Sequence, residues 1–295
     1  MALTLAEASK LSNDVLLQGV IETMVQESPV LQVMPFIEIV GNGLTYNREN
    51  EAAGAAFYDV GDTWAESTPT FTQQTATLRI LGGDADVDNF LKATRSNVQD
   101  LEAAIVQLKA RAVQRKFEDT FINGDSAADA NAFDGIDKLC ASGQTVSMGD
   151  NGDTLTLEKL DELIDCVKGG KPHIMLLSRR SRRKLNALSR ASGGILVSDR
   201  NAFGQMVEYY DGIPLGVCDW IADDKEVGTS GDCSTIYAMQ LGEGALAGLT
   251  GPGGVQVEQV GSLETRDASR TRVKWYVSVA LFNSVKLARL IGVRD

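Results

Sequence analysis

The chain has 295 residues, of which 43% are hydrophobic and 23% charged, a composition typical of a globular protein of about two domains. Its 40 acidic residues outnumber its 28 basic residues, and the resulting net charge of −12 disfavours tight binding to nucleic acid. No apolar run approaches the roughly 20 residues that span a bilayer, and the first seven residues have no basic region, so we expect neither a secreted nor a membrane-embedded protein.

The negative charge is concentrated in the first third of the chain. From Met1 to Leu91 there are thirteen acidic and three basic residues, a net charge of −10, while the remaining 27 acidic and 25 basic residues contribute only −2. Such asymmetry offers an electrostatic match to basic surfaces elsewhere, including those of a neighbouring subunit. The alternative is that both portions are simply solvated.

The first forty residues predict an arm. Apolar positions recur at helical spacing from Leu5 to about Gln26, and Ser28-Pro29 is expected to end this helix. The next residues, up to Val40, are apolar and expected to be extended after Pro35. Because this segment is too short for a core of its own, it must pack on the rest of the chain or on a neighbour.

An extended two-stranded hairpin is predicted next. Leu44–Arg48 forms one strand, and the return strand alternates from Phe71 to Arg79. The polar, Ala- and Gly-rich stretch from Glu49 to Thr68 has a tip, at residues 51–56, that cannot bury itself. Since an exposed strand pair invites association, arm and hairpin are expected to reach over neighbouring subunits.

A long helix follows, and the sequence specifies both of its ends. Ser96 and Gln99 form a capping-box pair at its start, and Gly124 is the residue expected just past its end. From Asn97 to Ile122 it would span roughly 39 Å, which suits a spine. Its apolar residues form a main stripe of Val98, Leu101, Ile105, Leu108 and Ala112, widened by a second face of Val106, Val113, Phe117 and Phe121.

Residues 132–246 alternate between helical and strand patterns, which predicts an α/β domain. A glycine-rich turn at Gly242–Gly254 then reverses the chain, and strands at residues 255–260, 271–280 and 283–291 are expected to join the sheet beside the spine helix. The elements expected inside the α/β domain are helices at Thr156–Val167 and Arg179–Leu188 and strands at Ile174–Leu177, Ile213–Val217 and Thr235–Gln240.

No catalytic, cofactor or metal site is predicted. The single histidine, His173, has no nucleophile-elbow motif to accompany it. Asp84–Asn89 mimics half of a calcium loop, but its sixth position is Asn89 and its twelfth is Arg95, where glycine and glutamate are required. Residues 242–248 miss the dinucleotide-binding spacing by one position, and four widely separated cysteines suit reduced thiols. We therefore expect no cofactor and no enzymatic activity.

The basic run from Ser178 to Lys184 is the strongest signal for nucleic acid. With Ser178 as N-cap and Leu185 and Leu188 inside, it is explained as an amphipathic helix with a charged outer face. Arginines at a helix N-terminus oppose its dipole and need a compensating partner, an intersubunit carboxylate first and packaged DNA second. The candidate intersubunit contacts are Lys109, Arg115, Arg179, Arg180, Arg182 and Arg183 with Glu49, Glu51, Asp59, Asp62 and Glu66.

The order and spacing of these elements resemble the major capsid proteins of tailed bacteriophages, whose shell fold is shared with encapsulins. The resemblance rests on Thr120–Asp125 followed by Ala132–Ile136 after the spine helix, on the alternating strand from Thr70 to Asn89, and on Gly212–Leu215. It implies an α+β capsid fold with an N-terminal arm (1–42), an extended hairpin loop (43–81), a peripheral domain with the spine helix (82–131 and 247–295) and an α/β axial domain (132–246).

The resemblance also implies a function. Hexamers and pentamers of the chain would form an icosahedral shell that encloses phage DNA without sequence-specific binding, in the virion and, during assembly, in the host cytoplasm. Scaffolding, portal and decoration proteins would be its other partners. Some relatives lock their shells with a lysine–asparagine bond from the hairpin, but this sequence has no lysine between Lys10 and Lys92. Two alternatives remain open: an encapsulin-like compartment around a cargo enzyme, and a soluble α/β enzyme with no identifiable site.

Overall fold

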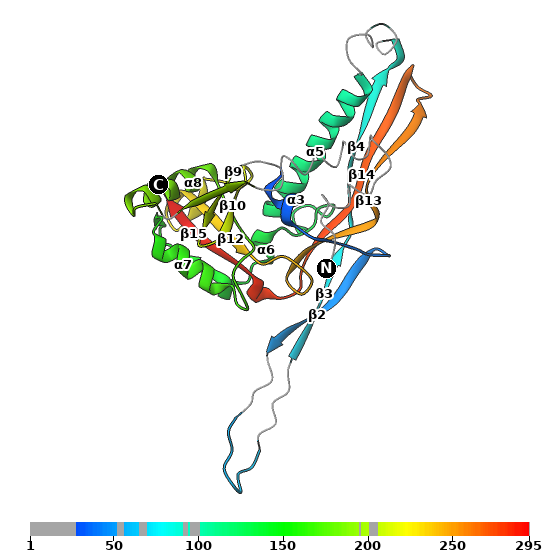
Figure 1. The fold of residues 1–295 in the computed structure, drawn as a ribbon. Coiled ribbons are helices and arrows are strands. Elements are labelled where there is room, and N and C mark those ends of the chain that lie inside the picture. The colour runs from blue at the N-terminus through cyan, green and yellow to red at the C-terminus, as the bar shows by residue number, and fades with distance from the viewer. Residues whose placement is uncertain are drawn as a thin grey trace.

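The computed structural model describes residues 28–51, 56–64, 70–90, 94, 101–194, 196–200 and 206–294. The predicted helix from Leu5 to Gln26, the capping box at Ser96 and the candidate contact Glu66 lie outside these residues. The described chain confirms the α+β class: it combines helices with three sheets, of which one is a hairpin that extends far from the rest (Figure 1). In this described part, no helix has the length and apolar character needed to cross a membrane.

One sheet combines strands from both ends of the chain, in the order β1-β13-β14-β4. Strands β13 (Leu246–Ser262) and β14 (Ala268–Leu281) form a long antiparallel pair. On their two sides, β4 (Arg79–Asp88) runs antiparallel to β14, and the short β1 (Phe36–Glu38) runs parallel to β13. From Arg270 to Val277 of β14, half-buried residues, three of them charged, alternate with buried ones, the pattern of a sheet that is covered on one face.

Helix α5 (Leu101–Asn123) packs on the apolar face of this sheet (Figure 1). The predicted spine helix is therefore present, but its main apolar stripe is only partly confirmed. Ile105 packs against the core, Leu108 and Ala112 are exposed, and the side chains of Val98 and Leu101 lie outside the described part of the chain. Leu108 is 61% exposed, whereas Val106, Val113 and Phe117 of the second face are buried. Both faces have helical spacing, so the pattern alone did not show which one meets the sheet.

Five aromatic rings form the centre of the core beneath α5, and all five are buried. Their close packing ties the helix to β1 and β14, because each such ring removes about 150–250 Å² of surface from water. The centroid of Phe117 lies 5.0 Å from that of Trp275, 6.2 Å from Phe36, 6.0 Å from Phe121 and 5.9 Å from Phe133.

Ser28 begins a short helix that the sequence analysis did not predict, and the helix predicted to end at Ser28-Pro29 lies outside the described residues. Helix α3 (Pro29–Val33) has proline in its first turn, and the Ser28 hydroxyl accepts a hydrogen bond from the Leu31 N–H at 3.1 Å. Leu31 and Met34 are fully buried in the core under α5. The extended segment predicted after Pro35 is confirmed as β1.

The second sheet has nine strands. Its main path is β5-β15-β12-β7-β10-β9-β8, with β11 beside β12 and β6 beside β15. Every residue of β7 is buried, as expected for a central strand that is covered on both faces. The strands span Thr145–Ser147 (β5), Leu287–Arg294 (β15), Ser230–Met239 (β12), Ile174–Leu177 (β7), Ile213–Val217 (β10), Met206–Tyr210 (β9), Val197–Arg200 (β8), Lys225–Val227 (β11) and Asp153–Thr154 (β6).

Helices cover both faces of the nine-stranded sheet. Helices α7 (Leu157–Cys166) and α8 (Arg179–Ala191) pack on one face, and the short α6 (Ile136–Leu139) packs with the end of α5 on the other. The hydroxyls of Thr156 and Ser178 accept hydrogen bonds from backbone N–H groups in the first turns of α7 and α8. These caps confirm that the sequence specifies where the two helices begin.

The strands β7 and β10 have their predicted bounds, but the last predicted strand is assigned to the wrong sheet. Its second half forms β15, which pairs with β12 in the nine-stranded sheet and not beside α5. Residues 284–286 before it form a short 3-10 helix. The glycine-rich segment is also divided, because residues 246–254 already belong to β13. Alternation predicts that a segment is a strand without identifying its neighbour.

Gly124 follows the end of α5 as predicted, but it does not have the left-handed conformation of a helix-capping glycine. Its N–H donates to the Thr120 carbonyl, and its own carbonyl accepts from the Gly135 N–H, both at 2.8 Å. A Cβ at this position would collide with the carbonyl oxygens of Thr120 and Phe133. Glycine is therefore required for the close approach of the loop that follows the helix.

Candidate assembly interface

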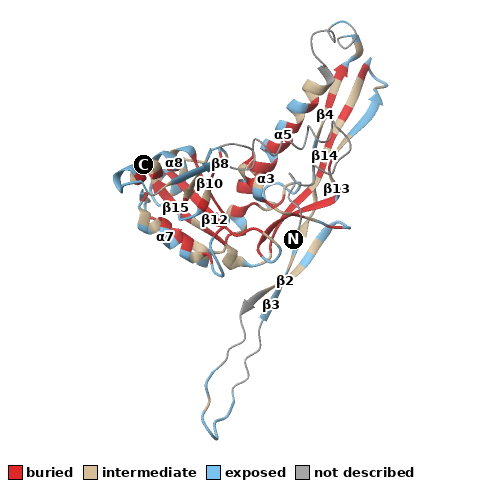
Figure 2. Ribbon diagram, viewed as in Figure 1, coloured by how far each residue is buried: buried red, intermediate tan, exposed pale blue. Residues whose placement is uncertain are grey.

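The predicted hairpin is confirmed and projects from the molecule as a separate ribbon. Its strands β2 (Gly43–Glu51) and β3 (Thr70–Thr77) pair with each other, and no third strand of the described chain joins them. Most described residues of the ribbon are exposed (Figure 2). At its root, Arg48 Nη2 donates to the Leu281 carbonyl at 2.6 Å, and the rings of Tyr46 and Phe282 lie 4.8 Å apart. The hairpin is thus fixed at one end and presents the other to its surroundings.

The sequence analysis placed the tip of this hairpin at residues 51–56, but the chain turns at Asp59–Asp62, and large apolar side chains gather at that far end. Phe57 and Val60 are fully exposed, and Trp64 is 77% exposed. The rings of Tyr58 and Trp64 stack with centroids 4.5 Å apart, which gives this end a defined shape. These exposed aromatic and aliphatic groups make the tip a candidate for a protein contact, because burial of their apolar surface against another protein would be favourable.

The acidic residues at the tip shape its turn. Asp59 accepts a hydrogen bond from the Val60 N–H at 2.7 Å, and Asp62 accepts one from the Asp59 N–H at 2.8 Å. Neither forms an ion pair with a residue that the structure describes, so both carboxylates remain candidates for an intersubunit contact. Glu49 and Glu51 lie in β2, but their side chains fall outside the described part of the chain.

The basic candidates on α5 have neighbours within the chain. The stem of Lys109 lies over Gly83 of β4, where an added Cβ would be 2.8 Å from Lys109 Cδ. Arg115 is exposed and lines a hollow of about 280 Å³ together with Glu118 and Asp219. Nothing in the sequence analysis singled out Glu118. It is only 6% exposed, and burial raises its pKa, although hydrogen bonds to Ser28, Gln114 and Trp220 partly offset the effect.

The arginines at the start of α8 divide into two groups. Arg179 makes a forked contact to Asp219, with Nε and Nη2 at 2.5 and 2.7 Å from its oxygens. Arg180 Nη2 donates to the Asp232 carbonyl at 2.6 Å, and Arg180 Nε lies 3.6 Å from Asp223. Arg179 and Arg180 therefore have, within their own chain, the negative partners that the sequence analysis expected from another subunit. Arg182 and Arg183 are exposed and keep their place as candidates.

Part of the acidic excess of the first third is also neutralised within the chain. On the outer face of the four-stranded sheet, Arg270 Nε and Arg272 Nε donate to Asp86 and Asp84 at 2.6 Å each. Arg266 forms a further ion pair with Asp86. These partners lower the pKa of Asp86 to about 2, chiefly through the Arg270 hydrogen bond. The aspartates that resembled a calcium loop are thus strand residues in a cross-strand charge ladder.

The single histidine has a structural contact. The Leu241 N–H donates to His173 Nδ1 at 3.0 Å, which joins the entry of β7 to the end of β12. Among the described residues there is no group of three or more His, Cys, Asp or Glu that could hold a metal ion. All four cysteines are free thiols.

A sequence model of the Phage capsid family matches residues 11–246. No curated protein matches the chain. Among solved structures, the holo-SrpI encapsulin complex from Synechococcus elongatus has a TM-score of 0.70 and 18% identity over 90% of this chain and 86% of that one. The capsid of a native GTA particle has a TM-score of 0.64 and 14% identity over 92% and 91%. A structure from Mycobacterium phage Bobi has a TM-score of 0.62 and 15% identity over 91% of both chains.

Proposed function

We propose that this chain, which belongs to the phage capsid family because that family's model matches most of its length, encloses the genomic DNA of a tailed phage or prophage. Family membership makes it a shell-forming structural subunit. The exposed aromatic end of the hairpin supports the assembly part of this proposal, because a projection that leaves Phe57, Val60 and Trp64 in water has its place on another subunit. The family match supports the enclosure of phage DNA.

The parts of the fold suit different places in such a shell. We assign the four-stranded sheet with α5 to a peripheral domain and the nine-stranded sheet to an axial domain at the centres of hexamers and pentamers. Because β15 pairs with β12, residues 287–294 go with the axial domain in this assignment and not with the peripheral one. Residues 1–42 and the hairpin would join neighbouring subunits.

The charge of the chain suits weak contact with packaged DNA. A net charge of −12 gives little general affinity for phosphate, so DNA would remain mobile inside the shell. Scaffolding, portal and decoration proteins are proposed as further partners, and the virion, with the host cytoplasm during assembly, as the location.

An encapsulin-like compartment is the second candidate, favoured by the similarity to the SrpI encapsulin structure. The two functions differ in what the shell contains. Particles purified from the native host and treated with nuclease should retain protected DNA of genomic length if the chain is a phage subunit. Particles that contain a co-purified protein cargo and no protected DNA would overturn the proposal. Expression of the chain alone, followed by electron microscopy, tests for shells or capsomers in either case.

A further inference from the structure

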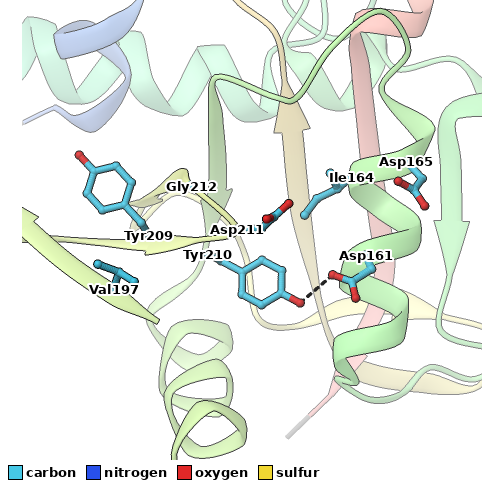
Figure 3. Close-up of a pocket in the computed structure, with 8 residues that line it drawn as sticks. All are labelled: Asp161, Ile164, Asp165, Val197, Tyr209, Tyr210, Asp211 and Gly212. Carbon is cyan, nitrogen blue, oxygen red and sulfur yellow. Dashed lines mark hydrogen bonds between the residues drawn. The ribbon is translucent and has the colours of Figure 1, made fainter. Parts of the chain in front are cut away.

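A hollow on the axial domain is lined by acidic groups. It has a volume of about 720 Å³ and lies beside the C-terminal half of α7, next to β8 and the β9–β10 turn. Figure 3 shows Asp161 and Asp165 along α7 on one side, Tyr209 and Val197 on the other, and Tyr210 pointing toward Asp161. The space suits a long cationic side chain, because carboxylates meet an aromatic and apolar wall there.

The carboxylates of this hollow are only partly satisfied within the chain. Asp211 forms an ion pair with Lys171, with Lys171 Nζ 2.6 Å from the carboxylate. Asp161 accepts a hydrogen bond from the Tyr210 hydroxyl at 2.7 Å, a neutral donor that leaves its charge uncompensated. Asp165 is exposed and forms no ion pair with any described residue. Among the residues that the structure describes, Asp161 and Asp165 therefore have no cationic partner.

The basic cluster at the start of α8, formed by Arg179, Arg180, Arg182 and Arg183, lies at the end of the axial domain opposite the hollow. Helix α8 starts directly after the C-terminal end of β7, whereas Lys171 and Asp211, at the hollow, precede β7 and β10. These strands are parallel, so the hollow and the start of α8 are at opposite ends of them. Within the cluster, Arg182 is exposed and forms no ion pair with a described residue.

A basic surface and an acidic hollow at opposite ends of one domain cannot meet within a copy, but they can meet between copies. Such a contact is heterologous, since each subunit offers its α8 to one neighbour and its hollow to another. Repeated around an axis, it closes a ring in which every subunit makes both contacts.

We propose that the start of α8 in one copy of this chain docks into the acidic hollow of the next copy, with Arg182 facing Asp165 and Asp161. This inference rests on the proposed function, because it identifies the surface by which axial domains meet in a capsomer. It gives Arg182 a partner on α7, whereas the sequence analysis placed that partner in the acidic first third. There, Asp84 and Asp86 are paired within the chain, and Asp59 and Asp62 remain candidates for other intersubunit contacts.

A charge-swap experiment on the full chain tests the contact. Arg182→Asp and Asp165→Arg should each raise the subunit concentration needed for assembly more than about tenfold, because like charges then face each other. The double variant restores opposite charges and should assemble within about threefold of the wild type. Matched controls are Arg190→Asp, on the last turn of the same helix, and Glu226→Arg, at the exposed middle residue of β11, which should assemble like the wild type. In 1 M salt the single variants should approach the wild type, since the screening length falls to about 3 Å.

Circular dichroism and sedimentation of the unassembled subunit establish first that each variant is folded. If the wild type forms no shells or capsomers, the proposed function fails before the contact is tested. If the wild type assembles and both single variants assemble equally well, the contact is wrong. It is also wrong if the folded double variant assembles no better than the single ones. Unchanged assembly of Arg182→Asp with less DNA retained in particles would assign α8 to packaged DNA and overturn the inference.

Discussion

Replacing the apolar groups at the hairpin tip should weaken assembly without weakening the subunit. In Phe57→Ser with Val60→Ser, two fully exposed side chains become polar while the stacked rings of Tyr58 and Trp64 remain. Complete burial of each side chain on a neighbour would contribute about 1.5–3 kcal/mol. If docking buries half of that surface, the double substitution costs about 1.5–3 kcal/mol for each hairpin, which is about a ten- to hundredfold higher concentration for assembly.

Two measurements separate assembly from folding. Light scattering or sedimentation velocity, over a series of subunit concentrations, gives the concentration at which shells or capsomers form. The free energy of unfolding of the unassembled subunit, measured in urea, should change by less than about 0.5 kcal/mol, because neither Phe57 nor Val60 is buried in its own chain. The matched control is Phe57→Leu with Val60→Ile, which keeps the tip apolar and should assemble close to the wild type. Assembly of the serine variant at the wild-type concentration would refute the assignment of the tip to an interface.

Three further results are expected. Phe117→Ala should lower the free energy of unfolding by about 3–5 kcal/mol, whereas Leu108→Ala on the exposed side of α5 should change it by less than about 0.5 kcal/mol, as urea denaturation can show. The pKa of Asp86 is lowered to about 2 in the folded chain, so its ion pairs contribute their full stabilisation at a pH above 3.8, the pKa of the unfolded state, and lose it as the pH falls toward 2. The free energy of unfolding of Asp86→Asn should therefore fall less than that of the wild type between pH 5 and pH 2, as urea titrations at each pH can show. Mature shells boiled in detergent with reductant should run as a single band near 31.7 kDa, because the hairpin has no lysine that could form a covalent bond to a neighbouring subunit. The only basic residues between Lys10 and Lys92 are Arg48 and Arg79, whose guanidinium groups cannot supply the amine nucleophile. A ladder of resistant bands would contradict this prediction.

The sequence was most informative where a local signal has one structural solution. The hydroxyls of Thr156 and Ser178 begin helices at the predicted positions, and apolar runs bounded by polar residues gave β7 and β10 their bounds. The family match also confirms the resemblance drawn from the order of these elements. Hydrogen bonds at a cap involve residues three positions apart, so a short segment contains all the information that is needed.

Predictions failed where the answer depended on distant residues. Leu108 and Phe117 both follow helical spacing, and only the presence of Trp275 and Phe36 beneath the helix decides which face is buried. Strand β15 alternates in a way that suits either sheet, and its pairing with β12 follows from the path of the chain as a whole. Arg180 resembled a surface cation, but its partners are more than 40 positions away in the sequence.

The same reasoning explains why a candidate interface is harder to identify than a fold. Charge counts suggested that the acidic first third would meet the basic helix α8, but they could not show that Asp84 and Asp86 face Arg270 and Arg272 across neighbouring strands. Asp161 and Asp165 stand out for a different reason: they line a hollow whose described lining residues include no cation, and the nearby Lys171 is engaged by Asp211. A charge is informative about a partner only after its neighbours in the same chain are known.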